Sequence, residues 1–232
     1  IERPFEITLT FADGTSRKQW CNARLWNLYR GTSVGPDILQ SLLMALERWL
    51  LEYAKEYPHE LDTVLLDILR RSDSAALTAV VASVATAYPH ASGETLLVLF
   101  RSTQCIRLDR QRLANEWQAL SKLSILQLNA KYKVYIEERE KADTLPHRRY
   151  DLETAILELQ FGPFAPRVHE ILDRYRAEMP PVEKQGEDDR IWRLALHRMD
   201  LRKYTVTEDV VEAPVASEDR TSPKEDRQYV RL

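Results

Sequence analysis

The sequence predicts an all-α protein with a short N-terminal β-hairpin or strand and a flexible polar tail at its C-terminus. Apolar residues recur at helical spacing along most of the chain, and prolines or capping residues separate the segments. Glycine occurs only 6 times in 232 residues, which disfavours β-sandwich and Rossmann-type folds because both need glycine at turns. A hydrophobic fraction of 44% with 30% charged residues is typical of a chain that folds around a core.

The N-terminal residues predict a hairpin or strand, and we expect residues 1–20 to continue a domain that lies upstream. Residues 4–11 alternate apolar and polar side chains, and Asp13-Gly14 then forms a favoured hairpin turn. A helical turn is predicted next, over residues 21–31, and Gly31 would end it. Because the chain does not begin with methionine, we expect it to be a piece of a longer polypeptide.

Residues 30–37, RGTSVGPD, have the glycines and hydroxyl residues of a phosphate-binding loop. The spacing argues against that function, because Gly31 and Gly35 are four residues apart and a Walker loop needs five. Pro36 and Asp37 also stand where such a loop has lysine and serine or threonine. A proline lacks the N–H donor, and an aspartate repels phosphate, so a nucleotide site is disfavoured here.

The same stretch is better explained as the end of one helix and the start of the next. Gly31 would end the first helix, Ser33 or Gly35 would cap the second, and Pro36 would lie in its first turn. This interpretation assigns no role to Arg30. If Arg30 is buried against an acidic residue, the junction is a fixed corner of the fold.

A long helix is predicted from residue 38 to residue 57, and Pro58 ends it. Its apolar residues cover well over half of the helix circumference, so we expect this helix to be packed on more than one side. These residues are Ile38, Leu39, Leu42, Leu43, Leu46, Trp49, Leu50 and Tyr53. Residues 59–71 follow as an amphipathic helix with acidic residues early and Arg70-Arg71 late, which suits the helix dipole.

The aromatic residues of this half of the chain have two interpretations. They form a binding surface, or they pack in the core, and buried packing is favoured for large aromatic side chains. The residues concerned are Trp20, Trp26, Tyr29 and Trp49.

Residues 74–89 carry no charge and look superficially like a membrane span. Sixteen residues are too few, because a bilayer needs about 20, so we expect a buried helix over 74–88. Ser92 would cap the following helix, which ends at Arg101, and another helix is predicted over 105–117.

The central helices form pairs with a period of roughly 35 to 40 residues, a spacing that is typical of helical repeats. Residues 37–57 pair with 59–71, and residues 74–88 pair with 93–101. This pattern predicts an α-solenoid of the HEAT or armadillo kind over residues 21–142, with an irregular helical bundle as the alternative.

Residues 143–205 are expected to form a second helical segment, and residues 206–232 a linker or disordered tail. Residues 120–142 fit either one long helix or two. The further expected elements are a loop over 144–151, a helix over 152–160 capped by Asp151, a helix over 166–179 opened by Pro163 and Pro166, a charged loop over 182–189, a helix over 191–199 and a strand over 202–211.

No catalytic, metal-binding or cofactor-binding residue stands out, so we expect a segment that is not an enzyme. The chain has no GxSxG motif, its five histidines have no ligand spacing, and His169-Glu170 lacks the second histidine of HExxH. Cys21 and Cys105 lie outside any CxxC pattern, which suggests two buried thiols in a reducing compartment. An enzyme with a site assembled from distant residues remains a third hypothesis, with His147 and His169 as its first candidates.

Two arginine clusters carry the alternative function, which is contact with phosphate, nucleic acid or an acidic partner. The candidate residues are Arg101, Arg107, Arg110, Arg112, Arg148 and Arg149. The other interpretation is solvated helix faces with local pairing to Asp109, Glu116 and Asp151, and it is favoured. A net charge of -3, from 33 basic and 36 acidic residues, gives no electrostatic case for DNA as the main partner.

Three stretches carry a family resemblance, namely RLWNLYRGTSVGPDILQSLLMALERWLLEYA, LLDILRRSDSAALTAVVASVATAYP and RIWRLALHRMDLRKY. Together they resemble a helical region of very large bacterial STAND-type P-loop NTPases, some of which act in anti-phage defence. The resemblance covers roughly residues 20–117 and 188–204 and includes no catalytic motif, so no catalytic residue is carried over.

The resemblance implies a cytoplasmic, non-catalytic helical scaffold or sensor, with ATP bound elsewhere in the parent chain. Its partners would be another protein or other domains of the same polypeptide, without membrane contact.

Overall fold

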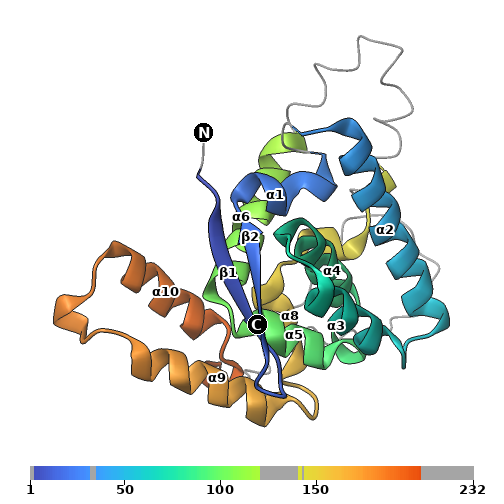
Figure 1. The fold of residues 1–232 in the computed structure, drawn as a ribbon. Helices are drawn as coiled ribbons and strands as arrows, with labels where there is room; N and C mark the ends of the chain where they lie inside the picture. The colour runs from blue at the N-terminus through green and yellow to red at the C-terminus, as the bar shows by residue number, and fades with distance from the viewer. Residues whose placement is uncertain (1–2, 32–34, 121–140, 143, 205–232) are drawn as a thin grey trace, which may run out of the picture.

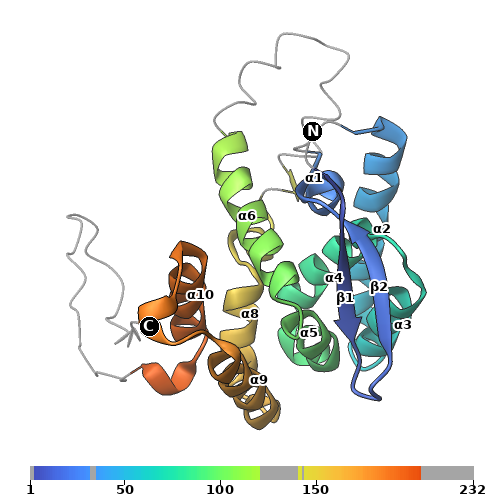
Figure 2. The same cartoon turned by 60° about the vertical axis from the view of Figure 1, so that its left-hand side comes forward.

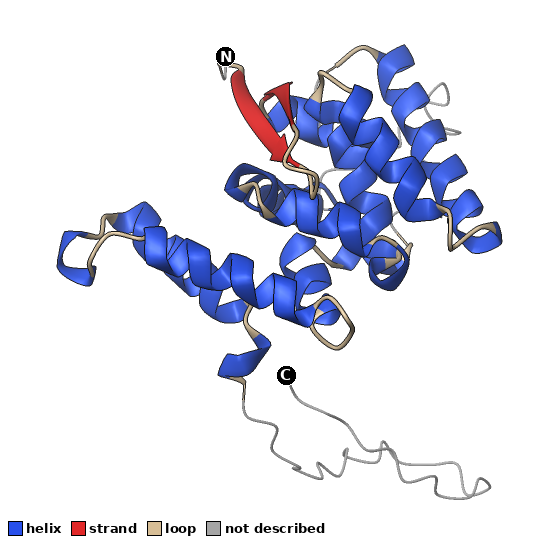
Figure 3. Ribbon diagram, turned by 60° about the horizontal axis from the view of Figure 1, so that its bottom comes forward, coloured by secondary structure: helices blue, strands red, loops and turns tan. Residues whose placement is uncertain are grey.

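The computed structural model describes residues 3–31, 35–120, 141–142 and 144–204, and this part of the chain is mostly helical with a short N-terminal β-hairpin (Figures 1 and 3). The elements are β1 (Phe5–Thr10), β2 (Ser16–Cys21), α1 (Ala23–Asn27), η1 (Leu28–Arg30), α2 (Asp37–Glu56), α3 (Leu61–Arg71), α4 (Ala75–Ala87), η2 (Pro89–Ala91), α5 (Gly93–Phe100), α6 (Thr103–Leu120), η5 (Pro146–Arg149), α8 (Leu152–Leu159), α9 (Ala165–Glu178), η6 (Val182–Lys184), α10 (Glu187–Arg198) and η7 (Leu201–Lys203). The expected helices at residues 121–140 and the tail at 206–232 lie outside the described residues.

The predicted hairpin is confirmed as two antiparallel strands, β1 and β2. Gly14 adopts a positive φ of 81° in the turn, a conformation that glycine reaches without strain. The alternating pattern buries Ile7 and Leu9 on one face. The hairpin lies along the helices rather than apart from them, because β2 packs on α3 and α4 while β1 contacts α5 (Figure 2).

The junction between η1 and α2 is a fixed corner, as the burial of Arg30 shows. Gly31 ends η1 in the left-handed conformation at φ 61°, which confirms the predicted stop. The predicted cap of α2 is wrong at Gly35, because Pro36, which was expected in the first turn, occupies the N-cap position and no side chain caps it. The alternative cap, Ser33, lies outside the described residues. Gly35 instead accepts a hydrogen bond through its carbonyl from the side chain of Gln40.

Helix α4 lies at the centre of the described fold, with α2, α3, α5 and α8 around it (Figure 1). Nearly all of its residues are buried, which confirms the interpretation of the uncharged run as a core helix. Ser74 caps it by accepting a hydrogen bond from the amide of Ala76 at 3.3 Å. Among the described helices, none has the length and apolar character that a membrane crossing needs.

The arrangement around α4 does not confirm a solenoid. In a solenoid, each repeat contacts only its neighbours. Here α2, which was expected to pair with the helix over 59–71, packs mainly against α4 and η1. The coarser expectation of a mostly helical fold with an N-terminal hairpin is confirmed.

Ser92 occupies the N-cap position of α5, as predicted, but the capping hydrogen bonds come from a side chain of another helix. The hydroxyl group of Ser92 donates to the carbonyl of Tyr88 at 2.8 Å and makes no cap bond. The carboxylate of Asp62 in α3 accepts hydrogen bonds from the amides of Glu94 and Thr95, each at 2.9 Å. This contact joins the start of α5 to α3 across 32 residues of sequence.

Helices α9 and α10 lie side by side and project from the rest of the described fold (Figure 3). Aromatic packing joins α9 to α5 and to α10. Tyr175 lies between Phe100 and Trp192 with edge-to-face contacts to both rings, and its hydroxyl donates to the carbonyl of Phe100 at 2.6 Å. Asp151 caps α8 through the amide of Thr154, as predicted.

Two boundaries in this segment differ from the prediction. Helix α10 begins at Glu187 and not at residue 191, because the side chain of Asp189 accepts a hydrogen bond from the amide of Gly186 and fixes an earlier start. Residues 202 and 203 belong to the 3-10 turn η7 and not to a strand, since Asp200 caps that turn through the amide of Arg202. The loop expected at 144–151 contains the 3-10 turn η5.

Candidate functional site

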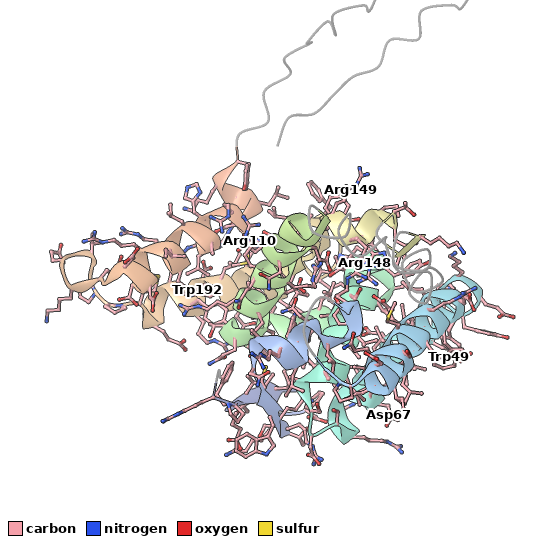
Figure 4. The ribbon with its side chains drawn as sticks, turned by 90° about the horizontal axis from the view of Figure 1, so that it is seen from above. Trp49, Asp67, Arg110, Arg148, Arg149 and Trp192 are labelled. Carbon is pink, nitrogen blue, oxygen red and sulfur yellow. The ribbon has the colours of Figure 1, made fainter. Side chains whose placement is uncertain are left out.

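The six arginines proposed as a contact surface do not share one face. Arg112 and Arg148 are buried, whereas Arg107, Arg110 and Arg149 are exposed. Figure 4 shows Arg148 between α6 and α2, Arg110 on the other side of α6, and Arg149 at the edge of the molecule. The structure therefore brings no continuous arginine surface together from this set.

Most of these arginines are paired within the fold. Arg112 bonds Asp109 at 2.7 Å, as the local-pairing interpretation predicted. Arg110 bonds Asp151 at 2.9 Å, but that partner lies 41 residues away and is not a local one. Arg107 stacks over the ring of Trp192 at 5.7 Å.

Arg101 is half-buried, and its guanidinium donates to the carbonyl of Thr10 at 3.4 Å. This hydrogen bond ties a partly exposed side chain to the hairpin.

A buried charge network joins α6 to the corner at η1. Arg30 bonds Glu116, and Arg112 bridges Asp109 and Glu116, with its Nη1 at 3.0 Å from Oε2 of Glu116. Trp26 donates its ring N–H to Asp109 at 3.4 Å. Burial alone would lower the pKa of Arg30 and Arg112, but the neighbouring carboxylates outweigh it and raise both pKa values. Both side chains are therefore charged in the interior.

A second buried group lies beside the first and centres on Glu47 of α2. Its carboxylate pairs with Arg148 of η5 and accepts a hydrogen bond from the hydroxyl of Ser83 in α4. Burial would raise the pKa of Glu47, but Arg148 and the hydrogen bonds outweigh it and lower the pKa to about 2. The ion pair joins α2 to η5, and the hydrogen bond from Ser83 joins α4 to the same carboxylate.

Several polar atoms of this second group have no hydrogen-bond partner among the described residues. They are Nε and Nη1 of Arg148, the hydroxyl of Tyr29 and Nε2 of His147. The His147 nitrogen lies 4.0 Å from Oε1 of Glu47, which is too long for a hydrogen bond. Burial lowers the pKa of His147 and raises the pKa of Tyr29 to about 12, so both groups are neutral at pH 7.

A pocket of about 950 Å³ opens next to this group, between α2 and the residues around η5. Its lining contains five basic and two acidic side chains, an excess of three positive charges. The basic residues are Arg30, Arg48, Lys55, Lys141 and Arg148, and the acidic ones are Glu47 and Glu52. Arg148 thus faces both the buried pair and the pocket.

Helix α2 also carries an exposed apolar face, which corrects the expectation that it is packed on more than one side. Ile38, Leu42 and Trp49 are 78%, 63% and 51% exposed. Trp49, Tyr53 and Tyr57 continue this line as an aromatic ladder, with ring centroids 5.4 and 5.0 Å apart. These five residues are called the α2 stripe.

The four aromatic residues considered for a surface divide into two pairs. Trp26 and Tyr29 are buried, as favoured, whereas Trp20 and Trp49 are exposed, contrary to the expectation.

Sequence reasoning missed Glu47, although a signal was present. The buried face of α2 runs through positions 40, 43, 47, 50 and 54, and Glu47 is the one charged residue on it. A charged side chain on a buried face needs a buried partner of opposite charge. Helical spacing alone shows this need but does not name Arg148.

The described residues assemble no catalytic constellation around the two candidate histidines. His147 lies in the charge group described above, and His169 contacts the side-chain oxygen of Gln160 at 3.2 Å. Both cysteines are buried free thiols, and burial raises the pKa of Cys105 to about 12, so it is not a nucleophile at neutral pH. No group of three His, Cys, Asp or Glu side chains in the described part is placed to hold a metal ion.

No protein-family model matches the chain, and a search of the curated proteins finds no match. The functional argument therefore depends on the geometry of the pocket and of the α2 stripe.

Proposed function

We propose that this chain is a non-catalytic helical interaction segment that binds an amphipathic helix of a protein partner along the α2 stripe. The observation that carries the proposal is the exposure of Ile38, Leu42 and Trp49 on one face of a single long helix. Scattered exposed apolar residues are normal, but a continuous line of them marks an interaction surface.

The dimensions of the stripe suit a helix as the partner. Ile38 and Tyr57 are 19 positions apart, which corresponds to about 28 Å along a helix axis at 1.5 Å per residue. The stripe residues recur mostly at spacings of four, so they form a ridge that packs into the groove of another helix. Trp and Tyr are the residues that contribute most binding energy in protein interfaces.

The charges of α2 favour a protein over a membrane surface. Helices that lie on membranes carry Lys and Arg on their polar face. The exposed charged residues of α2 are Asp37, Arg48, Glu52, Lys55 and Glu56, which give three acidic and two basic side chains. Such a mixed set does not attract an anionic lipid surface, whereas it suits the polar rim of a protein interface.

The family resemblance supports the same function. Helical regions of large STAND-type NTPases sense ligands, hold an autoinhibited state or form oligomer contacts, and an exposed apolar helix face serves each of these roles. A bacterial NTPase of this class is therefore the parent protein that we propose, with anti-phage defence or signalling as its setting. Two free cysteines suit a reducing, cytoplasmic compartment.

Site-specific photo-crosslinking in cells tests the proposal. A photoreactive amino acid at Leu42 is expected to capture a defined protein, and the same group at Val182, which is 57% exposed on η6, is the matched control. With the purified partner, Trp49→Ser should weaken binding about 30-fold, as for an interface hot spot, and Val182→Ser should leave it unchanged.

Three results would overturn the proposal. One is equal cross-linking at the two positions, and another is cross-linking at Leu42 only to lipid or to a second copy of the chain. The third is ATP hydrolysis by the purified chain that a substitution within it abolishes.

A further inference from the structure

We propose that the pocket between α2 and η5 binds a phosphorylated organic molecule, with its phosphate groups toward Arg148 and Lys55. The pocket is separate from the α2 stripe, because its α2 residues include Ser41, Met44 and Leu51, which lie on another side of the helix. The inference therefore does not depend on the proposed protein partner.

Buried donors without partners are the first observation. Arg148 is 4% exposed, and only its Nη2 bonds Glu47, while Nε and Nη1 have no hydrogen-bond partner among the described residues. Buried polar groups in native proteins are nearly always satisfied, so donors of this kind call for an unseen acceptor. A guanidinium with free N–H groups is suited to phosphate oxygens, which accept several hydrogen bonds at once.

The charge of the lining is the second observation. The pairs Arg148–Glu47 and Arg48–Glu52 account for the two acidic lining residues. Because Glu47 is ionised, its negative charge neutralises the positive charge of Arg148 and no other cation of the lining. Lys55 forms no ion pair with any described residue and lies on the same side of the pocket wall as Arg48. Because Arg30 is itself paired with Glu116, the charge of Lys55 is the part of this excess that is available to an anion.

The shape and the apolar part of the wall indicate that the ligand is more than a phosphate ion. The volume of about 950 Å³ falls at the upper end of the range of small-molecule sites, about 300–1,000 Å³. Met44, Leu51 and Leu145 provide apolar surface beside the basic residues. An organic group against these side chains, with its phosphate groups on Arg148 and Lys55, suits this mixed lining.

The stretch RGTSVGPD contributes to this pocket in a way that its motif did not suggest. Its Arg30 is a lining residue, held in place by Glu116, whereas the loop lacks the glycine spacing and lysine of a phosphate loop. Phosphate recognition here uses side chains from η1, α2 and η5, and not the backbone amides of one loop.

Isothermal titration calorimetry on the full 232-residue chain at constant ionic strength tests the inference. The probes are ATP, UDP-glucose and inositol hexakisphosphate, with tripolyphosphate, adenosine and citrate for comparison. At least one phosphorylated organic probe should bind more tightly than tripolyphosphate, and adenosine and citrate should not bind. Lys55→Glu should weaken that binding about tenfold or more, because it removes a charged contact and repels phosphate.

Lys184→Glu is the matched control, since it makes the same charge change on the exposed turn η6. It should leave binding unchanged. Arg148→Met should abolish binding, and far-UV circular dichroism checks that this variant folds. The Lys55→Glu variant tests the inference independently, even if Arg148→Met does not fold. The inference is refuted if no phosphorylated probe binds below 1 mM, if citrate or adenosine binds as tightly, or if Lys184→Glu weakens binding as much as Lys55→Glu.

Discussion

Replacing Glu47 with glutamine should destabilise the protein by about 3 kcal/mol at pH 7. Folding places Glu47 beside Arg148 and lowers its pKa from 4.5 to about 2, which corresponds to roughly 3 kcal/mol in favour of the folded state. Water screens this pair little, because Glu47 is only 4% exposed. The estimate agrees with the cost of about 3–5 kcal/mol for removing one partner of a buried ion pair.

The pH dependence of this effect has a definite sign. A carboxyl group whose pKa is lowered on folding contributes stability above its unfolded pKa and loses it as pH falls toward the folded pKa. The difference in unfolding free energy between wild type and Glu47→Gln should therefore fall from about 3 kcal/mol at pH 7 to roughly half of that at pH 3. Urea titrations followed by circular dichroism at several pH values measure it.

Glu52→Gln is the control, because Glu52 lies on the same helix and forms an exposed pair with Arg48. It should change stability by no more than about 0.5 kcal/mol. The double variant Glu47→Leu with Arg148→Met should recover most of the loss, since a buried pair is often replaced by apolar groups at little cost. A difference for Glu47→Gln that stays constant from pH 7 to pH 3, or that is below about 1 kcal/mol at pH 7, would contradict the reasoning.

Two further predictions concern the helix junctions around α5. Asp62→Ala should cost about 1–2 kcal/mol, because the amides of Glu94 and Thr95 lose their cap. Asp62→Asn should restore only part of that cap, because the two amides bond different carboxylate oxygens and asparagine has a single acceptor oxygen; urea unfolding of both variants compares them. Gly93→Ala should cost about 1–3 kcal/mol, because its new Cβ would lie 2.2 Å from the ring of Phe164. Adding Phe164→Leu should lessen the Gly93→Ala cost in thermal melts, and equal costs in both backgrounds would argue against a steric cause.

The structure shows the limits of local pairing rules at the arginines. Arg112 could be assigned partners from sequence, because Asp109 and Glu116 lie three and four positions from it on one helix, whereas the partner of Arg110, Asp151, is 41 residues away. Arg148 could not, because its partner Glu47 is 101 residues away. Helical spacing shows which residues share a face but not which faces meet.

The sequence alone determined the local elements of this protein. Asp13-Gly14 specified a hairpin turn because glycine adopts positive φ freely, and the run over 75–87 specified a core helix because it is mostly apolar and carries no charged side chain. Gly31 likewise specified the end of η1. These outcomes depend on backbone preference or on composition within a few turns, so no distant contact was needed to predict them.

Only the tertiary structure decided the candidate sites. The apolar residues of α2 predicted burial on more than one side, but α4 and η1 cover a single face and leave Trp49 exposed. The basic pocket arises because η1, α2 and η5 bring Arg30, Lys55 and Arg148 together from distant positions. Such sites depend on which helix faces pack against each other, and the packing follows from the whole set of competing apolar surfaces rather than from any one segment.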